Sequence, residues 1–187
     1  MSLPKDTVAP GIHVETLGAM RPLRTVVFSL GANLGDTLET LQGAVDQLCD
    51  TPNAIPVGVS PVYLTKPVGK LDQPDFHNLV LVMESTLTAR TLLERALAIE
   101  DAFGRERLEV NGPRTVDVDL IQVGPLSIDE ADLKIPHPRA HERAFVLVPW
   151  HDVEPGAVLE GHGPISELIA GLDTSGVRSV GPEVTLS

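Results

Sequence analysis

Two aspartates, Asp117 and Asp119, are the residues of this sequence whose type and spacing most clearly suggest chemistry. They lie in the run Arg114 to Val123, whose composition predicts a strand, and alternate residues of a strand share one face. Their Cα atoms would lie roughly 7 Å apart, so both carboxylates could share metal ions about 3.5–4 Å apart. Oxygen ligands favour magnesium over zinc. The alternative is a solvated sheet face whose acids pair with arginines, and spacing alone does not separate the two.

Cationic residues gather around this pair. Of the 14 Lys and Arg residues, six fall between positions 105 and 143, namely Arg105, Arg107, Arg114, Lys134, Arg139 and Arg143. The planar fork of arginine grips phosphate oxygens, and cations beside paired carboxylates suit a magnesium–triphosphate complex. Ordinary surface salt bridges are the alternative. His137 and His141 lack an intervening Glu or a third ligand, so zinc is not indicated, whereas a phosphate contact suits His137.

The chain as a whole is compatible with one ordinary domain of 187 residues. Its formal net charge of −12 disfavours general binding of nucleic acid. The single cysteine, Cys49, excludes an internal disulfide and suits the cytoplasm. No apolar run approaches the roughly 20 residues that span a bilayer. We expect a disordered extension over residues 1–22, one domain over 23–172 and a loose tail over 173–187.

The elements that must position the aspartates follow from periodicity and capping signals. Asp36 and Glu39 form a capping box, and Thr88 precedes a second helical pattern. The order strand, helix, strand, strand, helix, strand predicts an α+β fold, a ferredoxin-like α/β sandwich whose mostly antiparallel sheet carries packed helices. We expect strands at 25–31, 55–65 (interrupted at Pro61), 77–86 and 114–123, helices after Asp36 and Thr88, a helix from Pro138 toward Phe145, and a short helix at 165–172.

Several segments together resemble one family, the 6-hydroxymethyl-7,8-dihydropterin pyrophosphokinases of folate biosynthesis. The matching runs are SLGANLGD at Ser29 to Asp36, VSPVYLTKPVG with DQPDFHN ending at Asn78, GRERLEVNGPRTVDVDLI at Gly104 to Ile121, and IPHPRAHERAFVLVPW at Ile135 to Trp150. The sequence has no phosphate loop of the G-x-x-x-x-G-K-[ST] type and no dinucleotide, nucleophile-elbow or kinase motif.

This resemblance implies an enzyme that transfers diphosphate from ATP to 6-hydroxymethyl-7,8-dihydropterin, giving AMP and the pterin diphosphate. It implies two magnesium ions on Asp117 and Asp119, with Arg105 and Arg114 assisting transfer. The substrate-binding residues would be Thr65, Pro67, Val68, Gly69, Phe76, Asn78 and Phe145. The nucleotide-binding residues would be Glu100, Arg107, Arg114, His137 and Arg143. A cytoplasmic monomer that binds neither nucleic acid nor membrane is expected.

The sequence departs from the family's pattern in one loop. The family usually has Arg-Trp just before Gly-Pro-Arg, where this chain has Val110 and Asn111. In the family that loop closes over the substrates, so the departure bears on loop closure and nucleotide affinity. Two rival hypotheses remain: a pterin or nucleotide binding module that has lost catalysis, and a metal-dependent phosphotransferase with another acceptor. The two aspartates argue against the first, and Asn78, Phe76 and Phe145 argue against the second.

Overall fold

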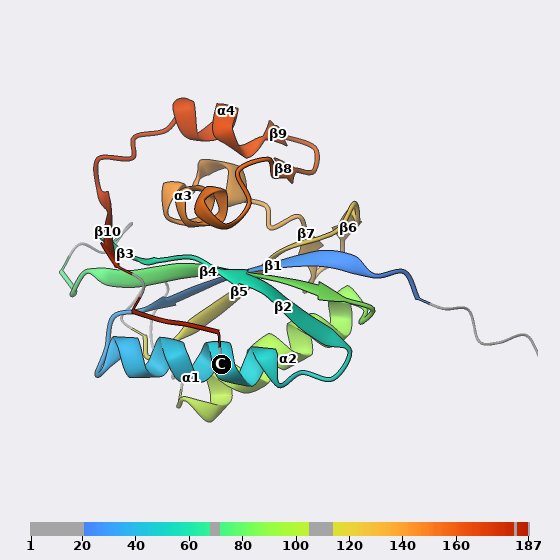
Figure 1. Cartoon of the computed structure of the whole chain (residues 1–187), viewed down its shortest axis with the longest axis horizontal. Helices are drawn as coiled ribbons and strands as arrows, with labels where there is room; N and C mark the ends of the chain where they lie inside the picture. The colour runs from blue at the N-terminus through green and yellow to red at the C-terminus, as the bar shows by residue number, and fades with distance from the viewer. Residues whose placement is uncertain (1–20, 68–71, 105–113, 182, 187) are drawn as a thin grey trace, which may run out of the picture.

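The computed structural model describes residues 21–67, 72–104, 114–181 and 183–186. These residues form a three-layered arrangement in which one sheet lies between two pairs of helices (Figure 1). No helix in these ranges combines the length and the apolar character that a membrane crossing requires.

The central sheet has six strands, all paired antiparallel. Along the sheet the order is β10-β3-β4-β1-β5, and β2 pairs with β4 next to β3. The strands are β1 (Arg24–Ala32), β2 (Ala54–Val59), β3 (Val62–Thr65), β4 (Phe76–Ser85), β5 (Asp117–Val123) and β10 (Val177–Gly181). Two small hairpins pair β6 (Ile128–Asp129) with β7 (Lys134–Ile135), and β8 (Val158–Leu159) with β9 (Gly163–Pro164).

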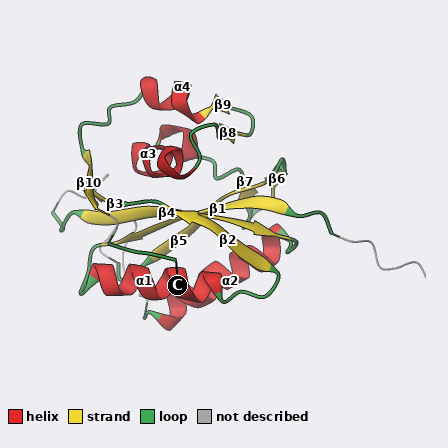
Figure 2. Ribbon diagram, viewed as in Figure 1, coloured by secondary structure: helices red, strands yellow, loops and turns green. Residues whose placement is uncertain are grey.

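Helices cover both faces of this sheet, as Figure 2 shows. One layer holds α1 (Thr37–Cys49) and α2 (Ala89–Ala102), and the other holds α3 (Ala144–Val153) and α4 (Ile165–Ala170). The strands are buried on both sides because their residues alternate between two cores. In β1, Val26 and Phe28 pack with α1 and α2, whereas Val27 packs with Trp150 of α3. The predicted ferredoxin-like α+β sandwich is confirmed, and α3 and α4 add a second helical layer.

The helix starts follow the predicted capping signals. The side chain of Asp36 accepts a hydrogen bond from the backbone N–H of Glu39, and Thr88 accepts one from Thr91. Each cap satisfies a backbone donor that the helix itself leaves unpaired. The predicted interruption at Pro61 is also confirmed, because β2 ends at Val59 and β3 begins at Val62.

Two expectations were wrong. The segment after Pro138 is not continuously helical: a short 3-10 helix spans Ala140–Glu142 and α3 begins only at Ala144. Here the backbone N–H of His137 donates to the carbonyl of Ile121 at 2.7 Å, which holds the chain beside β5. The tail was expected to be loose, but Val177–Gly181 forms β10 and pairs with β3. The backbone N–H and C=O groups along the open edge of β3 pair with this segment, and the amino-acid composition of the tail does not reveal that pairing.

Candidate functional site

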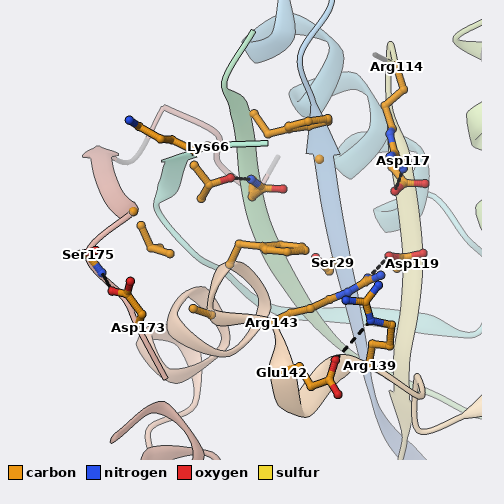
Figure 3. Close-up of a pocket in the computed structure, with 18 residues that line it drawn as sticks. Ser29, Lys66, Arg114, Asp117, Asp119, Arg139, Glu142, Arg143, Asp173 and Ser175 are labelled. Carbon is orange, nitrogen blue, oxygen red and sulfur yellow. Dashed lines mark hydrogen bonds and ion pairs between the residues drawn. The ribbon is translucent and has the colours of Figure 1, made fainter. Parts of the chain in front are cut away.

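A cavity of about 650 Å³ opens on the sheet face that carries α3 (Figure 3). Strands β1, β3, β4 and β5 contribute residues to it, together with the start of α3 and the segment before β10. Its lining residues of immediate interest are Ser29, Gly31, Thr65, Phe76, Asn78, Arg114, Asp117, Asp119, Arg143 and Phe145. We call it the larger cavity.

Asp117 and Asp119 lie on the same face of β5, as predicted. Both are partly exposed, whereas Val118 and Leu120 between and beyond them are buried in the core against α1 and α2. Pairing with the neighbouring strand fixes their positions along the sheet, since Gly31 of β1 pairs with Asp117 and Ser29 pairs with Asp119. The pair therefore stands on a rigid sheet with its carboxylates directed into the cavity (Figure 3).

Two arginines hold these carboxylates, and each also lies over a phenylalanine ring. Arg114 forms an ion pair with Asp117, and its guanidinium carbon lies 5.6 Å from the ring centre of Phe76. Arg143 bonds Asp119 at 3.0 Å and lies 5.5 Å from the ring centre of Phe145. Cations at this distance from aromatic faces are attracted by the ring quadrupole. The arginines thus link the acidic centre to the two aromatic rings of the cavity.

Two groups at this centre, Asp119 and His137, have pKa values shifted from their ordinary values, as is common at functional sites. Desolvation, and then the neighbouring Asp117 carboxylate, raise the pKa of Asp119 above its ordinary value. Desolvation also lowers the pKa of His137, against the opposing pull of Asp119. Like charges held together at a partly desolvated position favour a cation between them.

Opposite β5, two polar residues form a buried pair on β3 and β4. The side-chain nitrogen of Asn78 donates to the hydroxyl of Thr65 at 2.6 Å, and both residues are buried. Gly31 is the Cα partner of Asn78 in the β1–β4 pair. Its lack of a side chain leaves space for the Asn78 amide on the cavity floor.

A second cavity of about 450 Å³ lies on the other side of the aspartates and is called the smaller cavity. Arg114, Asp117, Asp119 and Arg143 line both cavities, so the acidic centre stands at their junction. Glu100 of α2 and His137 line the smaller cavity only, with Lys134 and Leu133 of the β6–β7 hairpin. The buried Glu100 accepts a hydrogen bond from the backbone of Val118 at 2.8 Å, which ties α2 to β5.

The donor set fits magnesium shared with a substrate better than a closed protein cage. Among residues that the structure describes, no group of three or more His, Cys, Asp or Glu side chains is placed to hold a metal ion. Asp117 and Asp119 supply two carboxylates at an open junction. Magnesium is commonly bound by one or two carboxylates, with substrate phosphates and water completing its shell.

Some predicted site residues are not brought together. Pro67 is buried but does not line either cavity, whereas its neighbour Lys66 lines the larger one. Val68, Gly69, Arg105 and Arg107 lie outside the described residues, as do Val110 and Asn111. His141 does not join His137 in the smaller cavity, because its ring stacks on His162 at 4.1 Å between ring centres.

Asn33 is a residue that the sequence reasoning missed. It is buried at the end of β1 and its side-chain nitrogen donates to Gln73 and to the carbonyl of Pro74, at 3.1 and 3.0 Å. Its side-chain oxygen accepts from the backbone N–H of Arg114 at 2.9 Å. One amide thus joins the segment before β4 to the segment before β5. No local pattern signalled this role, because the partners of its side-chain amide lie 40, 41 and 81 residues away in the sequence.

The comparisons with known proteins identify the family of the chain. Residues 27–155 match the sequence profile of the family described as 7,8-dihydro-6-hydroxymethylpterin-pyrophosphokinase. The 2-amino-4-hydroxy-6-hydroxymethyldihydropteridine pyrophosphokinase of Methylorubrum extorquens is 40% identical over 151 residues, which cover 81% of this chain and 95% of that protein. The protein of the same name from Mycobacterium tuberculosis is 40% identical over 168 residues, covering 83% and 87%.

Solved structures agree at the level of the fold. The HPPK-DHPS protein of Plasmodium falciparum superposes with a TM-score of 0.65 at 15% identity, over 82% of this chain and 45% of that one. The chain therefore spans less than half of that longer protein, and the likeness concerns architecture alone. The profile match and the relatives at 40% identity over most of both chains carry the assignment. The chain belongs to the 7,8-dihydro-6-hydroxymethylpterin-pyrophosphokinase family.

Proposed function

We propose that this chain transfers diphosphate from ATP to 6-hydroxymethyl-7,8-dihydropterin, a step of folate biosynthesis. The observation that carries the proposal is the junction of the two cavities, where Asp117 and Asp119 stand between Arg114 and Arg143. A phosphoryl-group transfer needs an acceptor on one side of an anionic metal site and a nucleotide on the other. The described geometry supplies both sides.

The larger cavity is assigned to the pterin. Phe76 and Phe145 line it and offer flat apolar faces to a bicyclic ring. Asn78, held by Thr65, offers an amide to the polar edge of that ring. The hydroxymethyl group would then point toward Asp117 and Asp119, on the β5 side of the same cavity.

The smaller cavity is assigned to the nucleotide. Arg143 and Arg114 reach it from the junction, and His137 lines it beside them. These three groups are donors suited to phosphate oxygens. The apolar side chains of Leu93, Leu97 and Leu133 line the same cavity and suit the base. Arg107 remains a proposed partner of the triphosphate and Arg105 a proposed aid to its transfer; both precede Arg114 and lie outside the described residues.

Asp117 and Asp119 would hold magnesium, two ions in the proposal, and the metal would supply neutralisation of charge on the transferring phosphates. In the structure these carboxylates are paired with Arg114 and Arg143. The same two arginines would be placed to bind phosphate oxygens of a triphosphate held at this centre.

In the reaction, a bond forms between the acceptor's hydroxyl oxygen and the β-phosphorus of ATP. The bond from that phosphorus to the oxygen bridging to the α-phosphate breaks, AMP leaves with this oxygen, and one proton is released. Arg114 and Arg143 stabilise charge on the phosphates, and Phe76 and Phe145 orient the acceptor so that its hydroxyl faces the phosphates. The single cysteine supports a reducing compartment such as the cytoplasm, and the family resemblance supports a monomer.

The test is to incubate the protein with ATP, magnesium and 6-hydroxymethyl-7,8-dihydropterin and to resolve the nucleotides by chromatography. We expect one AMP per pterin diphosphate and no more than a trace of ADP. Omitting the acceptor should abolish AMP formation. Stoichiometric ADP would instead indicate simple phosphoryl transfer and would overturn the proposal.

A further inference from the structure

We infer that the C-terminal strap, defined as residues 173–181 and 183–186, forms the acceptor-side wall of the larger cavity and determines which acceptors fit. The inference rests on the proposed placement of the pterin in that cavity. It assigns a role in substrate selection to a segment outside the matched family region, which ends at residue 155.

The strap reaches the cavity from the side opposite to the aspartates. Asp173, Ser175, Gly176 and Val177 all line the larger cavity. Figure 3 places Asp173 and Ser175 across the cavity from Asp117 and Asp119. Sheet order gives the same result, because β10 and β5 are the two ends of the order β10-β3-β4-β1-β5. Four strand spacings of about 4.8 Å separate the end strands by roughly 19 Å.

The strap also supports the polar pair that faces the pterin. Val177 is the Cα partner of Thr65 in the β10–β3 ladder, and Thr65 accepts the hydrogen bond of Asn78. Before the strand, a tight turn is fixed by Asp173, whose carboxylate accepts from the backbone of Ser175 at 2.9 Å. Hydrogen bonding to Ser175 lowers the pKa of Asp173, so this acceptor stays ionised. The wall is therefore locally ordered at the point where it meets the cavity.

The end of the strap is anchored on the far side of the sheet. After β10 the chain runs to the layer of α1 and α2 (Figure 1). There Val184 is buried in the core, and Gln42 of α1 exchanges two hydrogen bonds with the backbone of Thr185, at 2.9 and 3.0 Å. A segment fixed at both ends presents a wall of defined position, and such a wall can reject acceptors by size.

Added bulk on the wall tests this without removing any contact. A Cβ atom at Gly176 would meet no heavy atom within 4 Å and Gly176 lines the cavity, so Gly176→Phe should fold and add bulk at the cavity wall. Ser179→Phe is the matched control, because Ser179 is exposed on β10, three residues after Gly176, and does not line the cavity. Acceptor binding is measured by calorimetry with a non-hydrolysable ATP analogue present, and KM for each substrate by AMP formation.

We expect Gly176→Phe to weaken acceptor binding and raise acceptor KM by at least about tenfold, as steric rejection in a fitted pocket does. The affinity for the ATP analogue and the KM for ATP should stay within about twofold, and Ser179→Phe should match the parent protein. Equal acceptor affinity in the two variants, or an equal loss for both substrates in Gly176→Phe, would overturn the inference. Calorimetry measures acceptor binding without catalysis. A protein that binds the acceptor but forms no AMP would therefore contradict the proposed function and not this inference.

Discussion

Gly31 and Asn78 face each other across the β1–β4 pair so closely that a side chain on Gly31 would have to displace the Asn78 amide. A Cβ atom at Gly31 would lie 2.7 Å from the side-chain oxygen of Asn78. Asn78 cannot turn away freely, because it is buried and donates to Thr65 at 2.6 Å. The absence of a side chain on β1 is thus a condition for the orientation of the amide that faces the larger cavity.

Gly31→Ala should therefore raise the acceptor KM. Displacing Asn78 would cost its contact with the acceptor, about 1–3 kcal/mol, which is roughly a 5- to 150-fold change. The KM for ATP should change much less. Gly156→Ala is the control, since a Cβ there meets nothing within 4 Å. Unchanged acceptor kinetics in Gly31→Ala would show that Asn78 can move without loss.

Replacing either aspartate by its amide should nearly abolish turnover while the chain stays folded. Both side chains lie on the cavity face of β5, whereas Val118 and Leu120 carry the packing. Losing one ligand carboxylate should remove several kcal/mol of transition-state stabilisation, or about a thousandfold or more in rate. AMP formation at saturating magnesium, with circular dichroism, measures this for Asp117→Asn and Asp119→Asn. The exposed Glu94→Gln on α2 serves as control, and near-normal rates in the aspartate variants would make the pair structural.

Asn33→Ala should impair both substrates together. The variant loses the bonds to Gln73 and Pro74 and leaves the backbone N–H of Arg114 without its side-chain acceptor. An unsatisfied buried donor costs about 1–3 kcal/mol, and this partly buried N–H should cost less. Of its two backbone hydrogen bonds to residue 33, Arg114 would keep the one from the backbone N–H of that residue to its carbonyl, at 3.2 Å, and would be held less firmly at the junction. We expect a fall in kcat with higher KM for ATP and acceptor. Gln73→Ala removes only the Asn33–Gln73 bond and should have a smaller effect. An equal effect would show that this bond, and not the bond to the backbone of Arg114, links the two binding sites.

The segment that precedes Arg114 in the sequence offers a gain-of-function prediction. Val110 and Asn111, which lie outside the described residues, replace the Arg-Trp that the resemblance leads us to expect. A tryptophan buries about 150–250 Å², and partial burial is worth on the order of 1–3 kcal/mol. Val110→Arg with Asn111→Trp should therefore favour a closed loop by about 5- to 150-fold. Calorimetry with an ATP analogue and single-turnover rates test this, and no change in either would show that other groups already seal the site.

Local signals were sufficient for most of the fold. The cap at Asp36, the cap at Thr88 and the alternation around Asp117 and Asp119 involve neighbours in sequence, so periodicity and capping chemistry predict them. The helix expected from Pro138 began later, because a hydrogen bond from His137 to Ile121 holds that segment beside β5. That contact joins residues from different elements, and no local pattern encodes it.

The sequence by itself determined the chemistry of the centre: two carboxylates on one strand face, cations near them in the chain, and motifs that resemble one family. Tertiary structure alone decided which groups meet. It placed Arg114 on Asp117 and Arg143 on Asp119, put the acidic pair between two cavities, and made Asn33 a junction of two segments. It also brought Val177 beside Thr65, from a tail that composition marks as loose. Strand pairing joins backbone groups far apart in the chain, so its partners depend on sheet order and on which edge is open rather than on local residue types.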